Sequence, residues 1–200
     1  QLVLKLASPG VADFYQGSEL WDFSLVDPDN RRTVDFAARQ VFIDGLLPLL
    51  ARLEAGELVD SEVSELIEEW TDARIKLLVT MCGLRFRREH QDLLLQGDYL
   101  PLTAEGPSAH HVVAFARHHL SATLLTVVPR LIMSMARDAN ALPRGSAAWG
   151  AARLLLPPSA GQVRYRHVLT GEIVQLTEGH LLLAEIFRTC PVALLFAEAG

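Results

Sequence analysis

Residues 8–32 read SPGVADFYQGSELWDFSLVDPDNRR, and this stretch decides the fold expected for the whole chain. It is rich in acidic, arginine and aromatic residues, and it has no simple helical or strand period. Ser8-Pro9-Gly10 is a strong break, and residues 11–15 after it have the composition of a short strand. Because one strand cannot form a sheet, either this half of the chain is all-helical or the strand pairs with strands that lie outside the chain.

The residues before this stretch, QLVLKLA, fit a helix and a strand equally well, because the run is too short for its period to decide. The chain begins with Gln1 rather than Met. We therefore expect it to be a piece of a longer protein.

After the loop, the apolar spacing predicts three helices. The first covers residues 35–54 with Pro48 inside it, where a proline kinks or divides a helix. A short acidic helix capped by Asp60 or Ser61 follows, and a longer helix covers residues 73–94.

From Tyr99 onward the chain has short apolar runs separated by turn residues. The candidate strands are 99–104, 112–117, 122–128, 152–156, 162–167, 173–176, 181–185 and 192–196. The pattern predicts an antiparallel β module over residues 97–200, after a mainly helical part over residues 1–96. Residues 134–148 are expected to form a long loop.

Composition excludes several classes of protein. The net charge of -6 and the pI near 5.6 argue against a nucleic-acid binder, which carries a basic patch. No apolar run is long enough to span a bilayer, and no signal peptide precedes the loop. The two cysteines, Cys82 and Cys190, form no disulfide framework, so a reduced, cytoplasmic location is expected.

Histidine, cysteine and tryptophan residues suggest sites, but simpler roles are favoured. Members of the two histidine pairs at 110–111 and 118–119 would lie roughly 26 Å apart along a strand, so no metal site is predicted. Cys82 lies on the apolar face of a helix and is expected in the core. Trp70 and Trp149 are expected to pack rather than to bind sugar.

Longer motifs carry a family resemblance. PGVADFYQGSE resembles the last barrel strand of the α-amylase-type glycoside hydrolases. LWDFSLVDPDNRRTVDF is similar to the corresponding segment of the maltooligosyl trehalose synthase family, the (1→4)-α-D-glucan 1-α-D-glucosylmutases. LRFRREHQDLLLQGDYLPL, HVVAFAR and LLTVVPRL resemble the passage from the barrel into the C-terminal domain of that family. The chain departs from the family at Ala12, Ser18 and Thr33, which are not charged positions.

The resemblance implies an α+β fold that is the C-terminal part of a larger enzyme. Residues 1–7 correspond to the end of the seventh helix of a (β/α)8 barrel, and residues 11–15 to its eighth strand. The helices from residue 35 form the eighth helix region with extra helices, followed by an antiparallel β-sandwich. A complete barrel needs about 250 residues, so the remaining strands are expected upstream.

The activity that the resemblance implies is a retaining intramolecular transglycosylation. It converts the reducing-end α-1,4 bond of a maltodextrin to an α,α-1,1 bond, as a step in trehalose formation. Retention requires two carboxyl groups about 5–5.5 Å apart. In this superfamily the catalytic carboxylates come from earlier strands, so no catalytic residue is assigned here and the chain alone is expected to be inactive. No cofactor is implied.

Residues at the end of the eighth strand and in the loop after it are expected to bind substrate, because loops there form the active-site face of a barrel. The candidates are Asp13, Tyr15, Gln16, Glu19, Asp27, Asp29, Asn30, Arg31 and Arg32. The simpler interpretation is that residues 27–30 form a self-capped turn and that both arginines pair with nearby acids. Given the resemblance, we expect structural and sugar-contacting roles together.

The expected partners are a maltodextrin and the upstream barrel portion of the same protein, without nucleic acid or membrane. Apolar surface around Val11, Phe14 and the inner faces of the helices should be buried by that portion or by a second copy. Two other functions remain open: a non-catalytic carbohydrate-binding or interaction module, and another amylase-superfamily enzyme that acts on α-glucans.

Overall fold

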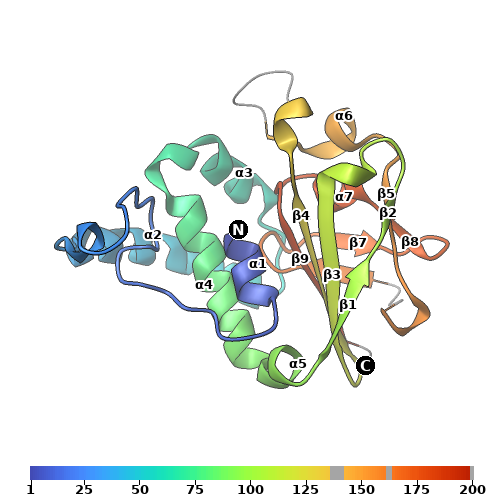
Figure 1. Cartoon of the computed structure of the whole chain (residues 1–200), viewed down its shortest axis with the longest axis horizontal. Coiled ribbons are helices and arrows are strands. Elements are labelled where there is room, and N and C mark those ends of the chain that lie inside the picture. The colour runs from blue at the N-terminus through green and yellow to red at the C-terminus, as the bar shows by residue number, and fades with distance from the viewer. Residues whose placement is uncertain (136–141, 161–163, 199–200) are drawn as a thin grey trace.

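Helices occupy the first half of the chain and antiparallel strands the second, as the α+β expectation requires (Figure 1). The computed structural model describes residues 1–135, 142–160 and 164–198. None of the described helices is long and apolar enough to cross a membrane.

The helical half contains five α-helices. They are α1 (Leu2–Ala7), α2 (Phe36–Glu54), α3 (Asp60–Glu68), α4 (Arg74–Glu89) and α5 (Gln91–Leu95). The first residues of the chain, whose pattern was ambiguous, are therefore helical. Asp35 caps α2, since its carboxylate accepts a hydrogen bond from the backbone N–H of Ala38 at 2.9 Å. The start of α2 thus agrees with the prediction.

Three details of these helices differ from expectation. Of the two effects expected of Pro48, a division of α2 is wrong, because buried leucines on either side of it anchor one continuous helix, whereas a kink stays a prediction. Neither Asp60 nor Ser61 caps α3, because Val59 precedes the helix and is held by a bond from its N–H to Thr170 O. The predicted helix over 73–94 is interrupted at His90, whose ring packs on Phe86.

The second half forms two antiparallel sheets. The larger has the order β1 (Asp98–Leu102), β3 (Val112–His119), β4 (Ala122–Pro129), β9 (Ala193–Glu198), β6 (Arg164–His167) and β7 (Ile173–Gln175). The smaller has the order β2 (Ala104–Glu105), β5 (Arg153–Leu155) and β8 (His180–Leu182). Every predicted strand in this half has a counterpart, so the antiparallel prediction is confirmed.

Some strand and loop boundaries were wrong. The run at 99–104 is divided between β1 and β2, which belong to different sheets. The run at 181–185 turns after β8 into the short helix α7 (Leu183–Ile186). The expected loop at 134–148 ends in α6 (Gly145–Trp149), because Trp149 is buried in the core; residues 136–141 lie outside the described part.

The larger sheet has apolar residues on both faces. Phe115, Leu124 and Leu194 point toward the helices, where α1 and α4 lie (Figure 1). Their neighbours Ala116, Leu125 and Leu195 point the other way, toward the smaller sheet, α6 and α7. Successive residues of a strand face opposite sides. The core residues on the side of the sheet that faces the helices therefore join the helical half to the sheet.

Residues 11–15 form no strand, which corrects that expectation for this chain. Their backbone pairs with no neighbouring strand, and a strand without a ladder partner is not stable. One contact to them is a hydrogen bond from Lys5 Nζ to Asp13 O at 2.9 Å.

Candidate functional site

Cationic side chains of the helices hold the loop of residues 8–35, and Arg39 and Lys76 bind its later part. The Arg39 guanidinium donates to Gly17 O at 2.9 Å and to Asp35 O at 3.0 Å, and its Nε lies 3.2 Å from Glu19 Oε2. Lys76 Nζ donates to Leu20 O at 2.7 Å. The loop is therefore anchored at residues 17–20 and at Asp35.

Two tryptophans join the loop to the segment between α3 and α4. Trp21 Nε1 donates to Trp70 O at 2.7 Å, and the two rings meet edge to face with centroids 6.0 Å apart. The Lys76 ammonium lies over the Trp21 ring, 5.3 Å from its centroid. The packing role predicted for Trp70 is thus confirmed, and Trp149 is buried as expected.

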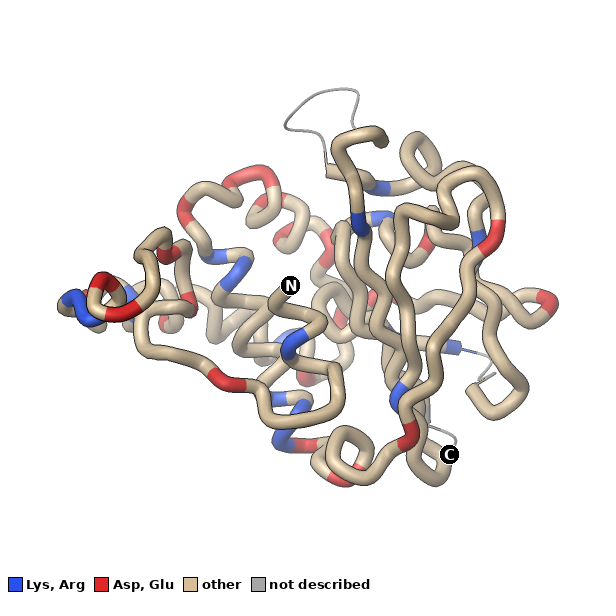
Figure 2. The backbone as a smooth tube through the Cα atoms, viewed as in Figure 1, with Lys and Arg blue, Asp and Glu red and all other residues tan. Residues whose placement is uncertain are grey.

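The DPDNRR segment is a compact turn that satisfies its own charges. Arg31 forms two bonds to the Asp27 carboxylate, one of them 2.8 Å between Nη2 and Oδ2. Arg32 pairs with Asp29, whose other oxygen accepts from the N–H of Leu25 at 2.7 Å. Figure 2 shows residues of both signs close together where this loop protrudes. The predicted arginine–acid pairing is confirmed.

The turn favours ionised carboxylates. The N–H of Leu25, followed by the Arg32 guanidinium, lowers the pKa of Asp29. The pKa of Asp22 is also lowered, first by a hydrogen bond from the Ser24 side chain and then by one from the Ser24 N–H. A proton donor for glycosidic cleavage instead needs a raised pKa. These acids are therefore suited to holding hydroxyl groups or arginines.

The predicted binding residues fall into two groups. Asp13, Tyr15, Gln16 and Glu19 lie at the start of the loop, and Asp27, Asp29, Asn30, Arg31 and Arg32 lie at the turn. In the described part of the chain, no hydrogen bond or ion pair joins one group to the other. The Asn30 side-chain oxygen is buried without a hydrogen-bond partner among the described residues. Sugar contact by these residues stays a prediction.

Apolar side chains of the loop and of α2 are exposed. Val11 is 94% exposed, Phe23 88% and Val26 84%, and Phe36 and Val41 of α2 are also exposed. Phe14 is partly covered, with Lys5 over its ring at 4.0 Å. Exposed apolar side chains that gather into a patch are typical of interaction sites. Val11 is exposed, and its burial by another portion or copy stays a prediction. Phe14 and the inner faces of the helices pack on this chain's own core, so the expectation was wrong for them.

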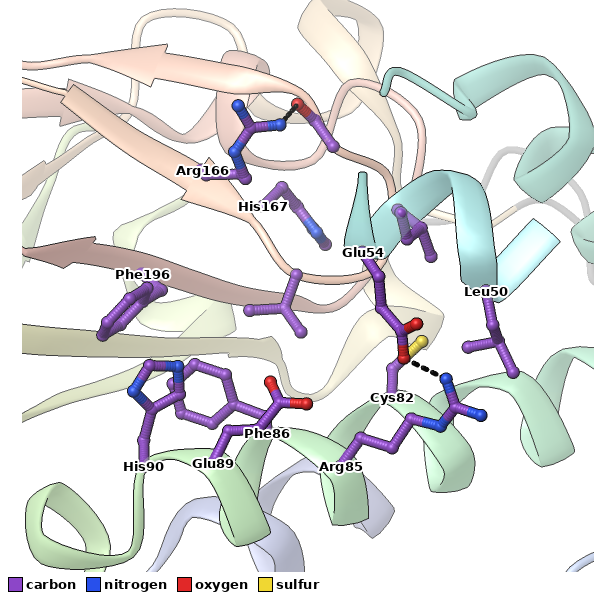
Figure 3. A pocket seen from close by; sticks show the side chains of 13 residues that line it. Leu50, Glu54, Cys82, Arg85, Phe86, Glu89, His90, Arg166, His167 and Phe196 are labelled. Carbon is purple, nitrogen blue, oxygen red and sulfur yellow. Dashed lines mark hydrogen bonds and ion pairs between the residues drawn. The ribbon is translucent and has the colours of Figure 1, made fainter. Parts of the chain in front are cut away.

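A pocket that the sequence did not indicate lies where the helices meet the larger sheet (Figure 3). Its volume is about 280 Å³, and its walls come from α2, α4, β6 and β9. Cys82 lines it and is buried, as expected for a core residue. Burial raises the pKa of the Cys82 thiol to about 12, so this cysteine is not a nucleophile at neutral pH. The four segments are far apart in sequence, so no local motif marks the pocket.

The histidine pairs lie apart in the structure. One pair precedes β3 and the other ends it. Within the described ranges, no three His, Cys, Asp or Glu side chains are grouped so that they could hold a metal ion.

Comparison with known proteins gives consistent matches. A protein named maltooligosyl trehalose synthase from Mycobacterium tuberculosis is 35% identical over 196 residues, which are 98% of this chain and 20% of that protein. The structure of maltooligosyltrehalose synthase from Arthrobacter ramosus matches with a TM-score of 0.68 at 34% identity, covering 99% of this chain and 21% of that chain.

A more distant match shows the fold alone. The crystal structure of an Anoxybacillus α-amylase has a TM-score of 0.56 at 18% identity and covers all of this chain and 32% of its own. No protein-family profile matches. The chain spans about a fifth of the length of the synthases it matches, and it is homologous to that segment of them.

Proposed function

We propose that this chain is the C-terminal part of a maltooligosyl trehalose synthase. The whole enzyme would rearrange the reducing-end α-1,4 bond of a maltodextrin to an α,α-1,1 bond by retaining intramolecular transglycosylation, in the cytoplasm and without a cofactor. The observation that carries this proposal is a match in both sequence and fold that covers nearly all of this chain and one fifth of the synthases.

In this proposal the chain closes a (β/α)8 barrel and continues into a C-terminal domain. Helix α1 is the end of the seventh barrel helix, residues 11–15 are the eighth strand, and α2 begins the eighth helix region. Residues 97–200 form the C-terminal β-sandwich. The backbone at 11–15, which pairs with no strand of this chain, supports this arrangement, because neighbouring barrel strands would supply the missing ladder partners. The exposed Val11, Phe23 and Val26 would be buried by the same upstream portion.

The chain contributes one wall of the substrate site and none of the catalytic carboxylates. Three of its loop acids are already paired, Glu19 with Arg39, Asp27 with Arg31 and Asp29 with Arg32. Such pairs present fixed oxygen and nitrogen atoms, which suit the hydroxyl groups of a glucan or a neighbouring loop. Asp13, Tyr15, Gln16 and Asn30 complete the proposed contacts.

The proposal is tested by adding the chain to an upstream portion. A truncated Arthrobacter ramosus synthase lacking the segment that matches this chain is mixed with the 200-residue chain, and loss of reducing ends from maltopentaose is measured. We expect activity from the mixture and none from either part alone. Conversion of maltopentaose by the isolated chain would show that catalytic residues lie within it.

The same mixture separates the proposal from a non-catalytic module. A module that only binds glucan would be slowed in electrophoresis through a gel that contains glucan, but it would not restore bond rearrangement. A synthase segment restores the non-reducing product, and a second product with reducing ends would indicate a hydrolase of the same superfamily.

A further inference from the structure

The pocket in Figure 3 has an aromatic side and a charged rim. The His90 ring lies between Phe86 and Phe196, at centroid distances of 4.4 Å and 4.3 Å. Phe86 and Phe196 are themselves 5.1 Å apart and meet edge to face. This cluster gives the pocket an aromatic wall, against which the C–H groups of a ring-shaped ligand can pack.

Two charged residues that line the pocket form no ion pair with any residue that the structure describes. Glu89, the last residue of α4, has no hydrogen bond or ion pair in the part of the chain that the structure describes, and its carboxylate points into the space (Figure 3). Arg166 donates to the carbonyls of Gly56 at 2.6 Å and Gly171 at 3.5 Å, but to no carboxylate among the described residues. By contrast, Glu54 and Arg85 are paired with each other.

Arg166 is held in place before any ligand binds. Both carbonyls that it contacts belong to glycines with positive φ, +80° at Gly56 and +76° at Gly171. At Gly56 an added Cβ would lie 3.6 Å from the guanidinium, so the backbone approaches it closely. A donor fixed in this way loses little freedom when it binds a ligand.

The charges select a neutral, hydroxyl-bearing ligand. A lone anion would face the Glu89 carboxylate, and a lone cation would face Arg166. Hydroxyl groups both donate and accept, so they can bond to both residues at once. The C–H face of a sugar ring can meanwhile pack on Phe196. A volume of about 280 Å³ is at the lower end for ligand pockets, which suits one ring.

We propose that this pocket is a second carbohydrate site that binds one glucosyl unit of an α-glucan, separate from the loop of residues 8–35. The aromatic wall, Glu89 and Arg166 predict a sugar as the ligand, and the choice of glucose rests on the proposed function. Such a site would hold a maltodextrin at the junction of the helices and the larger sheet.

The test uses the ¹⁵N-labelled 200-residue chain titrated with maltotriose and followed by amide chemical shifts. We expect shifts at His90, Val168 and Phe196, with binding in the millimolar range. Replacing Glu89→Ala should weaken this binding at least fivefold. Glu68→Ala is the matched control, because Glu68 is also an exposed glutamate that ends a helix; its affinity should equal that of the parent chain.

Three outcomes of the maltotriose titration would overturn the second site. These are no shifts at the pocket, shifts confined to residues 8–35, and equal affinity of the Glu89→Ala and Glu68→Ala variants. Shifts with glycine instead of maltotriose would assign the pocket to a zwitterion and would also overturn the proposal. If the mixture with the truncated synthase is active while the pocket shows no shifts, this inference fails and the proposed function stands. If the pocket residues shift but the mixture stays inactive, the proposed function fails and the second site stands.

Discussion

The indole N–H of Trp21 donates to the backbone carbonyl of Trp70 over 2.7 Å, although 49 residues separate the two. This bond and the edge-to-face contact of the two rings hold the middle of the loop against the segment that precedes α4. The Lys76 ammonium covers the Trp21 ring from α4. The position of the proposed sugar-contacting turn therefore depends on a contact made outside the loop.

Replacing Trp21→Phe should release the loop without unfolding the protein. The variant keeps an aromatic ring but loses the hydrogen bond, whose net value is about 1 kcal/mol. We expect faster proteolytic cleavage within residues 22–32 and little change in the melting temperature. Phe23→Leu is the control, because the Phe23 ring is 88% exposed. Equal cleavage of the two variants would show that the tryptophan contact does not hold the loop.

Replacing Arg39→Met should be more damaging than replacing Arg31→Met. Arg39 is mostly buried and bonds to Gly17, Glu19 and Asp35, whereas the Arg31 side chain is 69% exposed and pairs within its own turn. Hydrogen bonds to a charged group contribute about 1.5–3 kcal/mol when they are sheltered from water, and exposed pairs contribute little. The free energy of unfolding measured in urea should fall clearly for Arg39→Met alone.

The sequence predicted the strands well because their signals are local. Turn residues separate each run, and the apolar residues of β3 and β4 match the two faces that the sheet presents. Predictions failed where a distant contact decided the outcome. The start of α3 is set at Val59, whose N–H donates to the carbonyl of Thr170 more than one hundred residues later. The position of α6 is set by the burial of Trp149 in the core. No local pattern contains such information.

In the candidate site too, local contacts were predicted from the sequence and distant contacts were not. Pairing of Arg31 and Arg32 with acids within four residues was foreseeable, since both partners lie in one turn. Glu19 was predicted as a sugar ligand without its partner Arg39, which is 20 residues further on. The pocket beside Phe196 draws on four separate segments, so only the folded chain reveals it.

His167 should make the protein less stable in mild acid. It is fully buried, and its Nδ1 accepts from the N–H of Leu169 at 3.1 Å while Nε2 lies 3.2 Å from Val192 O. Burial lowers the His167 pKa to about 4, although the nearby Glu172 opposes this. The unfolded chain binds a proton near pH 6.5 and the folded chain only near pH 4, so stability falls as the pH is lowered between these values.

The measurement is urea unfolding at several pH values. The change attributable to His167 is on the order of 3 kcal/mol across this range. His167→Gln cannot titrate, so its free energy of unfolding should vary less between pH 6.5 and 4 than that of the parent. The Arg52 guanidinium lowers the pKa of Glu62 to about 2, so the loss of that ion pair begins near pH 4.5 and is complete only below pH 2. The two effects therefore overlap little, and parallel curves for variant and parent would contradict the assignment to His167.

Gly171 and Gly179 form a matched pair that separates backbone strain from steric overlap. Their φ angles are +76° and +77°, so alanine at either position pays the same cost of about 1–2 kcal/mol for a left-handed conformation. A Cβ at Gly179 would meet nothing within 4 Å, whereas at Gly171 it would lie 2.2 Å from the backbone oxygen of Glu57. Gly171→Ala must therefore also displace the segment between α2 and α3 from β6 and β7. We expect a larger drop in the melting temperature for Gly171→Ala than for Gly179→Ala, and equal drops would show that the helical half does not approach the sheet this closely.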